Sequence, residues 1–500
     1  MKAAHNLLVV SDLHLSQGWD PETGKTSRLE DFLRDDAFGR FLGYHEGVKN
    51  QPRFGGRPWL LVLNGDIFDF LQVVSWPEDG PPMQSIKGVG DRSQLHPQER
   101  AYGLGTTPGE SAWKLEQIAR GHQRFFAALG AFVAHGNQVL VIRGNHDVDL
   151  HWEAVQQRFV VETHEAYARQ QSREGIGPPL TLAACQAGIG FAPWFYHEAE
   201  RIYVEHGGQY DALNCLRNVL NPVLPDDPEH LELPWGSLFV RYLFNKVEDV
   251  HPFADNVKPL TRYLSWAFRR DPFKALEVLV SRGWVFLKAF WMACRKATSS
   301  ARYASDEEAA PSEEPTSLPA DVTEQIEALA RWRVASAWQG WTGALLQGLI
   351  SLLALLISAA FVALAGVTLF VNNGPRWMAA VYAAAALFTA FLRHRLVQGL
   401  SRLLARNELL DAAAELEQIL APAYGVHVIA MGHNHRPAIE HLEDAWYVNT
   451  GAWVPLYEKE GPIEGREALT FLRLRWDDEG TPELLRWDDA GGAPTRMALE

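Results

Sequence analysis

The stretch VLVIRGNHD, residues Val139–Asp147, joins a strand pattern to a group of polar residues that can carry chemistry. Four branched apolar residues in a row, followed closely by a glycine, are typical of a strand that is buried on both faces. This stretch therefore predicts a buried strand whose carboxyl end opens into a polar loop.

The same pattern, an apolar run followed by polar residues, recurs elsewhere in the chain. Four more apolar runs end in polar residues: Leu7–Val10 before Ser11-Asp12-Leu13-His14, Trp59–Leu63 before Asn64-Gly65-Asp66, Ile202–Val204 before Glu205-His206-Gly207, and Val426–Met431 before Gly432-His433-Asn434-His435. Stretches with helical spacing, notably Arg28–Tyr44 and Ala112–His135, lie between them. Alternation of strand and helix predicts a layered α/β fold, in which ligands bind where strands end.

Composition and charge narrow the class of protein. The chain has 500 residues with 47% hydrophobic and 21% charged residues, which excludes a wholly disordered, collagen-like or coiled-coil protein. The net charge of −15 disfavours a nuclease, because nucleic acid needs a basic surface. The three cysteines are too scattered for a disulfide framework or a cysteine zinc site. The first fifteen residues do not have the pattern of a secretory signal peptide.

The order of strands and helices is interrupted after residue 211, which predicts a large insertion in one α/β core. We expect a core formed by residues 1–211 and 422–500, with three segments between its halves: a helical insertion or cap over 212–295, a flexible acidic linker over 296–321 and a helical region over 322–421. The apolar segment Ala275–Cys294 carries three charged residues and is expected to lie on a membrane surface or within the cap.

Two apolar runs, about 342–371 and 377–392, predict a transmembrane hairpin. A bilayer core about 30 Å thick needs about 20 helical residues, which the first run exceeds and the second approaches. Arginines cluster outside the hairpin, so the positive-inside rule places both flanks, and the α/β core with them, in the cytoplasm at the inner membrane. The alternative is a pair of hydrophobic helices buried within a soluble domain.

The polar ends of the strands supply ligands for metal ions. They contain carboxylates, imidazoles and one asparagine, without any thiolate: Asp12, His14, Asp66, Asn145, His146, His206, His433 and His435. Oxygen and imidazole ligands suit Mn²⁺, Fe or Zn²⁺. Eight candidates exceed what one tetrahedral ion needs and suit two ions that share a bridging carboxylate.

These motifs resemble the calcineurin-like metallophosphoesterase superfamily. The family pattern is Asp-x-His, Gly-Asp-x-x-Asp, Gly-Asn-His-Asp/Glu, a lone His and Gly-His-x-His, and all five blocks occur here in that order: Asp12-Leu13-His14, Gly65-Asp66-Ile67-Phe68-Asp69, Gly144-Asn145-His146-Asp147, His206, and Gly432-His433-Asn434-His435. The resemblance implies two mixed sheets flanked by helices and two divalent metal ions, with Mn²⁺ expected. It covers roughly residues 1–211 and 422–480.

The resemblance also implies a role for each residue. Asp12, His14 and His435 would hold one ion, Asp66 would bridge, and Asn145, His206 and His433 would hold the other; His197 is the alternative to His206. His146 would not bind metal but would stabilise charge on the phosphate or protonate the leaving oxygen. Asp147 would orient His146, Arg143 would neutralise a phosphate oxygen, and Asp69 would support the ligands.

A narrower resemblance concerns Gly432–Pro437 and Tyr447–Trp453, which look like the C-terminal part of bacterial UDP-2,3-diacylglucosamine pyrophosphatases. We therefore expect a membrane-anchored, cytoplasm-facing phosphohydrolase that cleaves phosphoester or pyrophosphate bonds, on a lipid-linked substrate, by attack of a metal-bridging hydroxide. One alternative is a phosphodiesterase or phosphatase for soluble nucleotides or phosphoproteins. Another is a non-catalytic membrane interaction or sensor protein. Nucleic acid is not expected as a partner.

Overall fold

The computed structural model describes most of the two halves of the expected core and parts of the region between them: residues 5–175, 177–211, 214–245, 318–330, 357–358, 360–368, 375–403, 408–456, 466–467, 469–477 and 481–497. The chain divides into one unit of residues 1–209, 213–326 and 413–500 and a second unit of 210–212 and 327–412. Ala275–Cys294 and most of the expected linker 296–321 lie outside the described residues.

The larger unit is built around a seven-stranded sheet that contains the first and the last strand of the described residues. Its order is β18 (Ala493–Arg496), β17 (Glu483–Asp488), β16 (Thr470–Leu474), β1 (Asn6–Val10), β4 (Trp59–Asn64), β5 (Gln138–Ile142) and β6 (Ile189–Ala192). Strands β1, β4, β5 and β6 run parallel, while β16 pairs antiparallel with β1. All five residues of β1 are buried, as its continuous apolar sequence predicts.

A second, five-stranded sheet packs against the first. Its order is β12 (Ala438–His441), β13 (Trp446–Asn449), β11 (Val428–Met431), β8 (Ile202–Glu205) and β7 (Phe195–Glu198). Strand β11 lies between β13 and β8 and is parallel to both. Apolar side chains of both sheets form one core between them, including Val9, Val62, Val204 and Ala430. The prediction of two mixed sheets flanked by helices is therefore confirmed.

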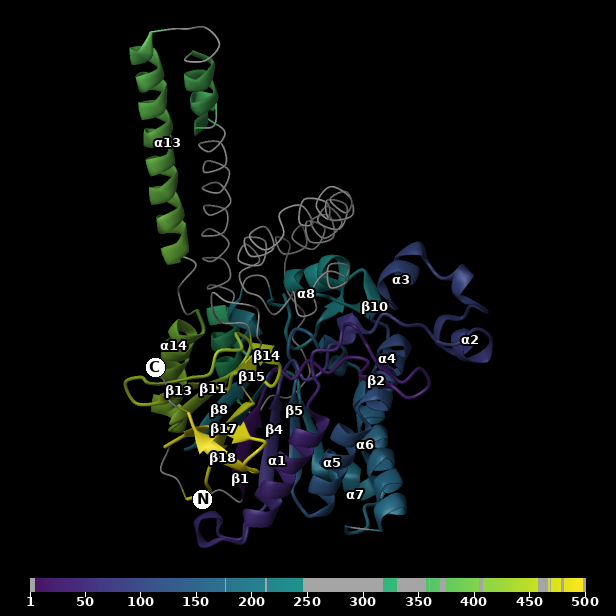
Figure 1. The fold of residues 1–500 in the computed structure, drawn as a ribbon. Coiled ribbons are helices and arrows are strands. Elements are labelled where there is room, and N and C mark those ends of the chain that lie inside the picture. Colours follow the sequence, from purple (N-terminus) through teal and green to yellow (C-terminus); the bar gives the residue numbers. More distant parts are fainter. Residues whose placement is uncertain are drawn as a thin grey trace. The chain divides into compact units, whose positions relative to one another are not determined.

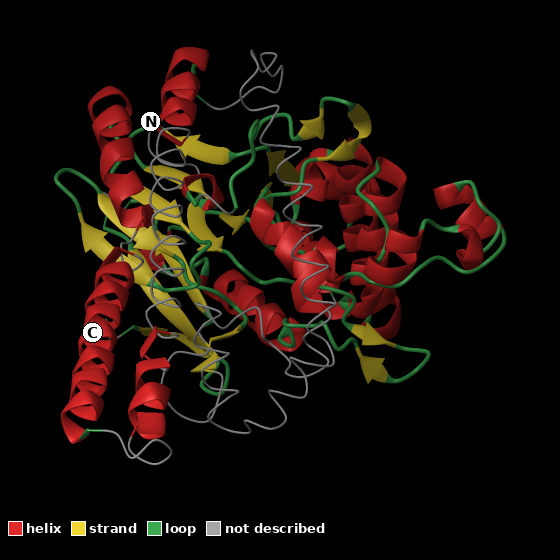
Figure 2. Cartoon of the chain, turned by 90° about the horizontal axis from the view of Figure 1, so that it is seen from above, coloured by secondary structure: helices red, strands yellow, loops and turns green. Residues whose placement is uncertain are grey.

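Helices cover the outer faces of this sandwich, as Figures 1 and 2 show. In Figure 1, α1, α5 and α6 lie on one side of the strands and α14 lies on the other. The helical bounds in this unit are α1 (Asp35–Val48), α2 (Pro81–Lys87), α3 (Pro97–Tyr102), α4 (Pro108–Gly121), α5 (Gln123–Ala134), α6 (Glu153–Glu174), α7 (Leu182–Gly188) and α8 (Trp235–Phe239), with α14 (Glu408–Tyr424) extending into it from the second unit. Phe38, Phe125 and Phe159 from three of these helices join the aromatic core behind the first sheet.

The described part of the insertion after β8 differs from the helical segment that its composition suggested. Residues 223–231 form an antiparallel hairpin of β9 (Val223–Leu224) and β10 (Asp227–Leu231) before the short helix α8. Pro222, Pro225 and Pro228 explain the difference, because proline cannot continue a helix from its interior. The helical prediction for 212–295 is therefore wrong for this stretch. Two further two-stranded pairs are β2 (Trp19–Asp20) with β3 (Lys25–Thr26) and β14 (Pro455–Leu456) with β15 (Arg466–Glu467).

The second unit contains α13 (Arg376–Leu403) and the helical residues 360–366. Among the helices of the described residues, none is both long and apolar enough to cross a bilayer. In α13 the charge-free run from Trp377 to Leu392 ends at Arg393, so it extends only about 24 Å against a bilayer core of about 30 Å. Most of the other apolar run, namely residues 342–356, 359 and 369–371, lies outside the described residues. The predicted transmembrane hairpin is thus unsupported.

A buried ion-pair cluster fixes the loop between β1 and α1. The Glu30 carboxylate accepts hydrogen bonds from the backbone of Ser16, Gly18 and Phe32, and it lies 3.1 Å from His122 Nε2. The other ring nitrogen of His122 lies 3.1 Å from Asp35. Because the residues before Asp35 belong to this loop, α1 begins at Asp35 and not at Arg28, where the expected helical stretch began. His122 also separates α4 from α5 within the expected single helix Ala112–His135.

His122 is expected to stabilise the fold in a pH-dependent way. Burial alone would lower its pKa, but Glu30 and Asp35 raise the pKa from 6.5 to about 10. The imidazolium therefore contributes fully below about pH 6.5, and its contribution is lost as the pH rises through about 10. We expect His122→Asn to cost about 3–5 kcal/mol at pH 6.5 and much less at pH 10, measured by urea unfolding. A cost that is constant with pH would contradict the charged state of His122.

Candidate metal centre

The five polar motifs follow strands whose carboxyl ends meet at one edge of the sandwich. β1, β4 and β5 of the first sheet lead to the loops with Asp12, Asp66 and Asn145, and β8 and β11 of the second sheet lead to His206 and His433. Backbone hydrogen bonds tie these loops together, since Leu13 N and His14 N both donate to Asp66 O at 3.0 Å. Residues more than 400 positions apart in the sequence are thereby brought together.

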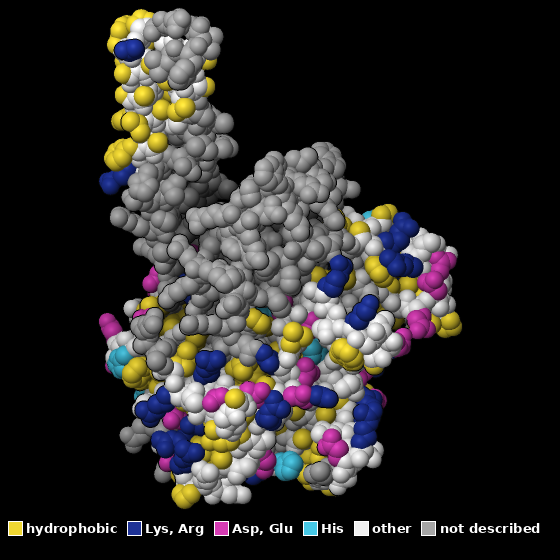
Figure 3. Space-filling view, viewed as in Figure 1, with side chains coloured by type: hydrophobic (Ala, Val, Ile, Leu, Met, Phe, Trp, Pro, Cys, Tyr) yellow, Lys and Arg dark blue, Asp and Glu magenta, His cyan; other side chains and the backbone are white. Residues whose placement is uncertain are grey.

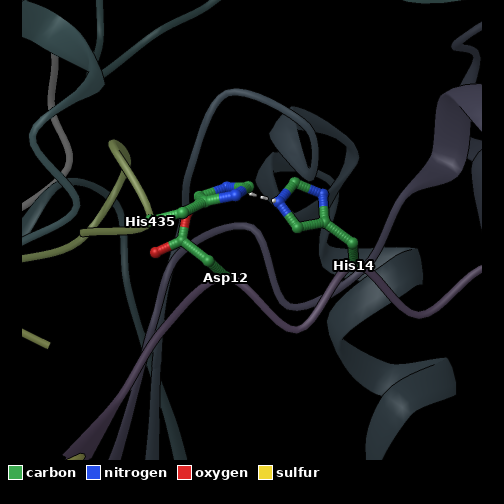
Figure 4. A group of neighbouring side chains, drawn as sticks. All are labelled: Asp12, His14 and His435. Carbon is green, nitrogen blue, oxygen red and sulfur yellow. Dashed lines mark hydrogen bonds and ion pairs between the residues drawn. The ribbon is translucent and has the colours of Figure 1, made fainter. Parts of the chain in front are cut away.

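The first ligand group consists of Asp12, His14 and His435 (Figure 4). The Nε2 atoms of His14 and His435 lie 3.2 Å apart, and His435 Nε2 lies 3.2 Å from Asp12 Oδ1. All three residues are buried. Figure 4 shows the two imidazoles turned toward each other, with the Asp12 carboxylate beneath the His435 ring.

The second ligand group consists of Asp66, His206 and His433, with Asn145 beside it. His206 Nε2 lies 3.1 Å from Asp66 Oδ2 and 3.2 Å from Asn145 Oδ1. The rings of His206 and His433 are 5.2 Å apart and nearly perpendicular. The two groups match the two sets that the sequence motifs imply. His197 lies on β7 and belongs to neither group.

The spacing of these atoms fits divalent metal ions. Two ligand atoms that are each about 2.1 Å from one ion, at an angle of about 100°, lie about 3.2 Å apart. Two separations in the first group and two around His206 are 3.1–3.2 Å, and the candidate ligand atoms of each group all lie within 4.8 Å of one another. Imidazole nitrogens and carboxylate oxygens without thiolates also suit Mn²⁺, Fe or Zn²⁺. The residues present therefore fit a two-ion centre.

The backbone of the ligands is strained. Seven described non-glycine residues have a positive φ, and five of them are candidate ligands: Asp12 (55°), His14 (53°), Asp66 (51°), His433 (69°) and His435 (59°). This left-handed conformation costs an L-residue roughly 1–2 kcal/mol, and such costs gather at functional sites. The left-handed backbone forms tight turns, and these turns direct the ligand side chains toward the centre.

This strain predicts an unusual ranking of stabilities in metal-free protein. With chelator present, His14→Gly is expected to be more stable than His14→Ala by about 1 kcal/mol, because only glycine adopts positive φ without strain. At His206, where φ is not positive, the order should reverse by about 0.5–1 kcal/mol. Urea unfolding of the four variants measures both differences. Equal stability of the glycine and alanine variants at position 14 would contradict the strain.

Two motif glycines are required because carboxylates pack directly against them. A Cβ on Gly144 would lie 2.2 Å from Asp66 Oδ1, and a Cβ on Gly432 would lie 2.5 Å from Asp12 Oδ2. Asp12 Oδ2 also accepts a hydrogen bond from His433 N at 3.0 Å. Asp66 therefore packs against the Gly144 loop and Asp12 against the Gly432 loop, while both carboxylates face the centre.

Burial and opposite charges set the pKa values of the ligands. Burial would raise the pKa of Asp12, but His435 lowers it to about 2. The pKa of Asp66 is likewise held well below its usual range by His206 and His146, against the effect of burial. Burial would lower the pKa of His206, but Asp66 and Asp12 raise it to about 10. The centre thus keeps its carboxylates ionised and favours positive charge beside them.

His146 is oriented by Asp69. Its Nδ1 lies 2.7 Å from Asp69 Oδ2, and the same oxygen lies 3.7 Å from His14 Nδ1. The Asp147 carboxylate instead accepts hydrogen bonds from the backbone N–H groups of Gly144 at 2.5 Å and Ile67 at 2.8 Å. The expectation that Asp147 orients His146 is therefore corrected, because the Asp147 side chain is engaged with the backbone of two motif loops.

Arg143 occupies a different environment from the one the motif implied. It is buried, and its Nη2 donates to the backbone carbonyl of Val219. It lines a small pocket of about 20 Å³ beside Asn145 and His206. Arg143 therefore links the loop after β5 to the segment that follows β8, and its role toward phosphate stays a prediction.

The comparison with protein families agrees with this geometry. The family model described as calcineurin-like phosphoesterase matches residues 5–283. The chain belongs to this family. No curated protein matches the chain. The matched region ends before Gly432, so the assignment of His433 and His435 to the centre rests on the contacts described above.

Three residues that support the centre from outside the motifs, Lys114, Ser237 and Asn214, were not predicted from the sequence. The buried Lys114 on α4 pairs with Asp149 at 3.0 Å and holds the turn that follows Asp147. Ser237 and Asn214, from the segment after β8, contact Asn145. Lys114 stands at a helical position that is otherwise buried, and this is the one sequence feature that points to its ion pair with Asp149. A single serine or asparagine, such as Ser237 or Asn214, gives no such indication.

Proposed function

We propose that this member of the calcineurin-like phosphoesterase family is a two-metal hydrolase of phosphoester or pyrophosphate bonds. The observation that carries the proposal is the pairing of two ligand groups, each with buried imidazoles and a carboxylate at metal-ligand spacing. Mn²⁺ is the proposed ion at both sites. Asp12, His14 and His435 would hold one ion, Asn145, His206 and His433 the other, and Asp66 would contact both.

The chain's own residues suit an in-line displacement at phosphorus. When bound, the two ions would lower the pKa of a water molecule and neutralise charge on the phosphoryl group. Asp69 holds His146 through Nδ1, which leaves Nε2 to donate a proton to the leaving oxygen. The His146 side chain is 14% exposed, more than those of His14, His206 and His435. It is thus the imidazole that a substrate reaches most readily.

The full chain should hydrolyse bis(p-nitrophenyl) phosphate when supplied with Mn²⁺. Chelation should remove the activity, and Mn²⁺ should restore it. A parallel panel of a phosphomonoester, a nucleoside diphosphate and a lipid-linked pyrophosphate would separate the soluble from the lipid substrates. If none of these compounds is hydrolysed with Mn²⁺, Fe²⁺ or Zn²⁺, the proposal is refuted.

We also propose that the second unit attaches the enzyme to a lipid membrane, which favours a lipid-linked substrate. Every exposed position of α13 between Trp377 and Phe391 carries an apolar side chain, and Figure 3 shows this surface in yellow. The polar side chains of Ser358 and Thr389 instead face each other between the two helices, where Ser358 also donates to Ala386 O at 3.3 Å. Polar groups inside and apolar groups outside are typical of helices surrounded by lipid.

Basic residues favour a particular membrane face. Arg393 and Arg395 follow the apolar part of α13 and would meet anionic headgroups, which are concentrated on the cytoplasmic side of membranes. On this proposal, the catalytic unit acts at the cytoplasmic face of the inner membrane.

Replacing apolar residues on this surface should release the protein from vesicles. Leu387 and Phe391 are 72% and 60% exposed, so Leu387→Glu with Phe391→Glu should reduce co-flotation with anionic vesicles at least about tenfold without unfolding the catalytic unit. The matched control is Trp19→Ser with Leu33→Ser, which changes exposed apolar residues of the larger unit. Unchanged flotation of the α13 variant would refute membrane attachment through this surface.

A further inference from the structure

The segment of residues 214–245 is fastened to the loops that carry the metal ligands. Its backbone and side chains make hydrogen bonds to three regions of the larger unit: Val219 O to Arg143, Leu231 N to Thr106 Oγ1 at 2.9 Å, Arg241 Nη2 to Gly103 O at 2.9 Å and Leu104 O at 2.7 Å, and Asn245 Nδ2 to Leu71 O at 2.8 Å. These contacts lie on the loops after β4 and β5 and on the turn before α4. The segment therefore forms part of the wall around the centre.

Two contacts from this segment converge on Asn145. The buried hydroxyl of Ser237 donates to the backbone carbonyl of Asn145 at 2.9 Å. The side-chain amide of Asn145 donates through Nδ2 to Asn214 Oδ1 at 3.4 Å. One contact thus holds the backbone of the Gly144-Asn145-His146 turn, and the other holds the orientation of the amide.

The orientation of this amide decides whether Asn145 can bind metal. An asparagine side chain offers one oxygen acceptor and one NH₂ donor, and only the oxygen can coordinate a cation. In the structure, Asn145 Oδ1 faces His206 Nε2 at 3.2 Å, while Nδ2 faces Asn214. A flipped amide would aim its NH₂ group at the ion. The acceptor on Asn214 disfavours that flip.

Close packing leaves Asn214 and Asn145 little space to move. A Cβ on Gly236 would lie 2.0 Å from Asn214 Oδ1, and a Cβ on Gly208 would lie 2.9 Å from Asn145 Oδ1. Both neighbours are glycines whose backbones touch these amides. The amide pair is therefore enclosed by the chain on either side.

We propose that Asn214 and Ser237 are positioning residues for the second metal ion, so that docking of residues 214–245 and metal binding at Asn145, His206 and His433 are thermodynamically linked. The inference rests on the proposed two-metal function. Loss of a residue that orients a ligand typically weakens metal affinity about 10–100-fold. Because linkage is reciprocal, the second ion should in turn increase the hydrogen-exchange protection of residues 214–245.

Titration of the metal-free full chain with Mn²⁺ tests the proposal. Calorimetry should give two sites for the wild type. In Asn214→Leu and in Ser237→Ala, one site should weaken about 10–100-fold while the other keeps its affinity. Electron paramagnetic resonance should change accordingly, from the exchange-coupled signal of a Mn²⁺ pair to the signal of a single Mn²⁺ at the same metal concentration.

Two further variants separate positioning from general damage. Asn214→Asp keeps the hydrogen-bond acceptor, so the Mn²⁺ affinity of its second site should lie within about threefold of the wild-type value. Asn218→Ala removes a local hydrogen bond to Asn221 N at 2.9 Å in the same segment, without contact to Asn145, and should bind two ions normally.

The outcomes distinguish this inference from the proposed function. A wild type that binds no Mn²⁺ would refute the two-metal function itself. A wild type that binds two ions, with Asn214→Leu and Ser237→Ala binding both equally well, would overturn the positioning role alone. Equal weakening of both sites in the two variants, together with a lower melting temperature, would also overturn it, because it would indicate only a loss of folding stability.

Discussion

Asp66→Ala is expected to lower kcat at least about 10³-fold. Asp66 Oδ2 lies 3.1 Å from His206 Nε2, and Asp66 Oδ1 accepts a hydrogen bond from His146 N at 2.8 Å. The carboxylate thus contacts both His206 of its own ligand group and the residue proposed to protonate the leaving group. Removing it would take away charge that both proposed ions need, which corresponds to several kcal/mol of transition-state stabilisation.

Alanine at position 66 also meets a positive φ of 51°, so the activity loss needs a stability control. Asp66→Gly removes the same carboxylate without backbone strain and should be equally inactive. Asp36→Asn, at an exposed carboxylate on α1, should keep wild-type activity. Steady-state hydrolysis of bis(p-nitrophenyl) phosphate with saturating Mn²⁺ measures all three. Activity of either Asp66 variant within tenfold of the wild type would contradict the bridging role.

His146→Gln is expected to lower kcat about 10²–10⁴-fold while both metal ions remain bound. The ring belongs to neither of the two ligand groups assigned to the ions, and Asp69 fixes its Nδ1 at 2.7 Å. If Nε2 protonates the leaving oxygen, the loss should be larger for an alkyl phosphate, whose alkoxide leaves poorly, than for a p-nitrophenyl ester. His197→Gln, on β7, is the matched control and should leave kcat unchanged.

Two results would contradict this role for His146. A loss of bound metal in His146→Gln, measured by elemental analysis, would place the ring among the ligands, as its position near His14 and Asp69 also permits. An equal loss for aryl and alkyl esters would exclude proton donation to the leaving group and favour stabilisation of charge on the phosphoryl oxygens.

Much of the core could be predicted from the sequence, because buried parallel strands have a distinctive pattern. The runs Trp59–Leu63 and Val139–Ile142 coincide almost residue for residue with β4 and β5. Their carboxyl ends share one sheet edge, so the polar motifs that follow them meet without any further information. The same logic brings His206 and His433 together at the ends of β8 and β11.

Other parts of the centre could not be predicted, because they depend on contacts between distant residues. The positive φ of Asp12 and Asp66 leaves no mark on residue type, since glycine would be the usual choice at such positions. The engagement of Asp147 with Gly144 N and Ile67 N, rather than with His146, depends on how two loops pack. The prolines around 223–231 argue against a helix there. The apolar and aromatic residues of the surrounding segment nevertheless favoured a helical prediction.

Anomalous diffraction from a crystal of the full chain grown with Mn²⁺ tests the two-metal centre most directly. We expect two peaks per chain. One should lie among Asp12, His14, Asp66 and His435, and the other among Asp66, Asn145, His206 and His433. No peak at either place, or a pair of peaks at ions bound by other residues, would refute the two-metal centre.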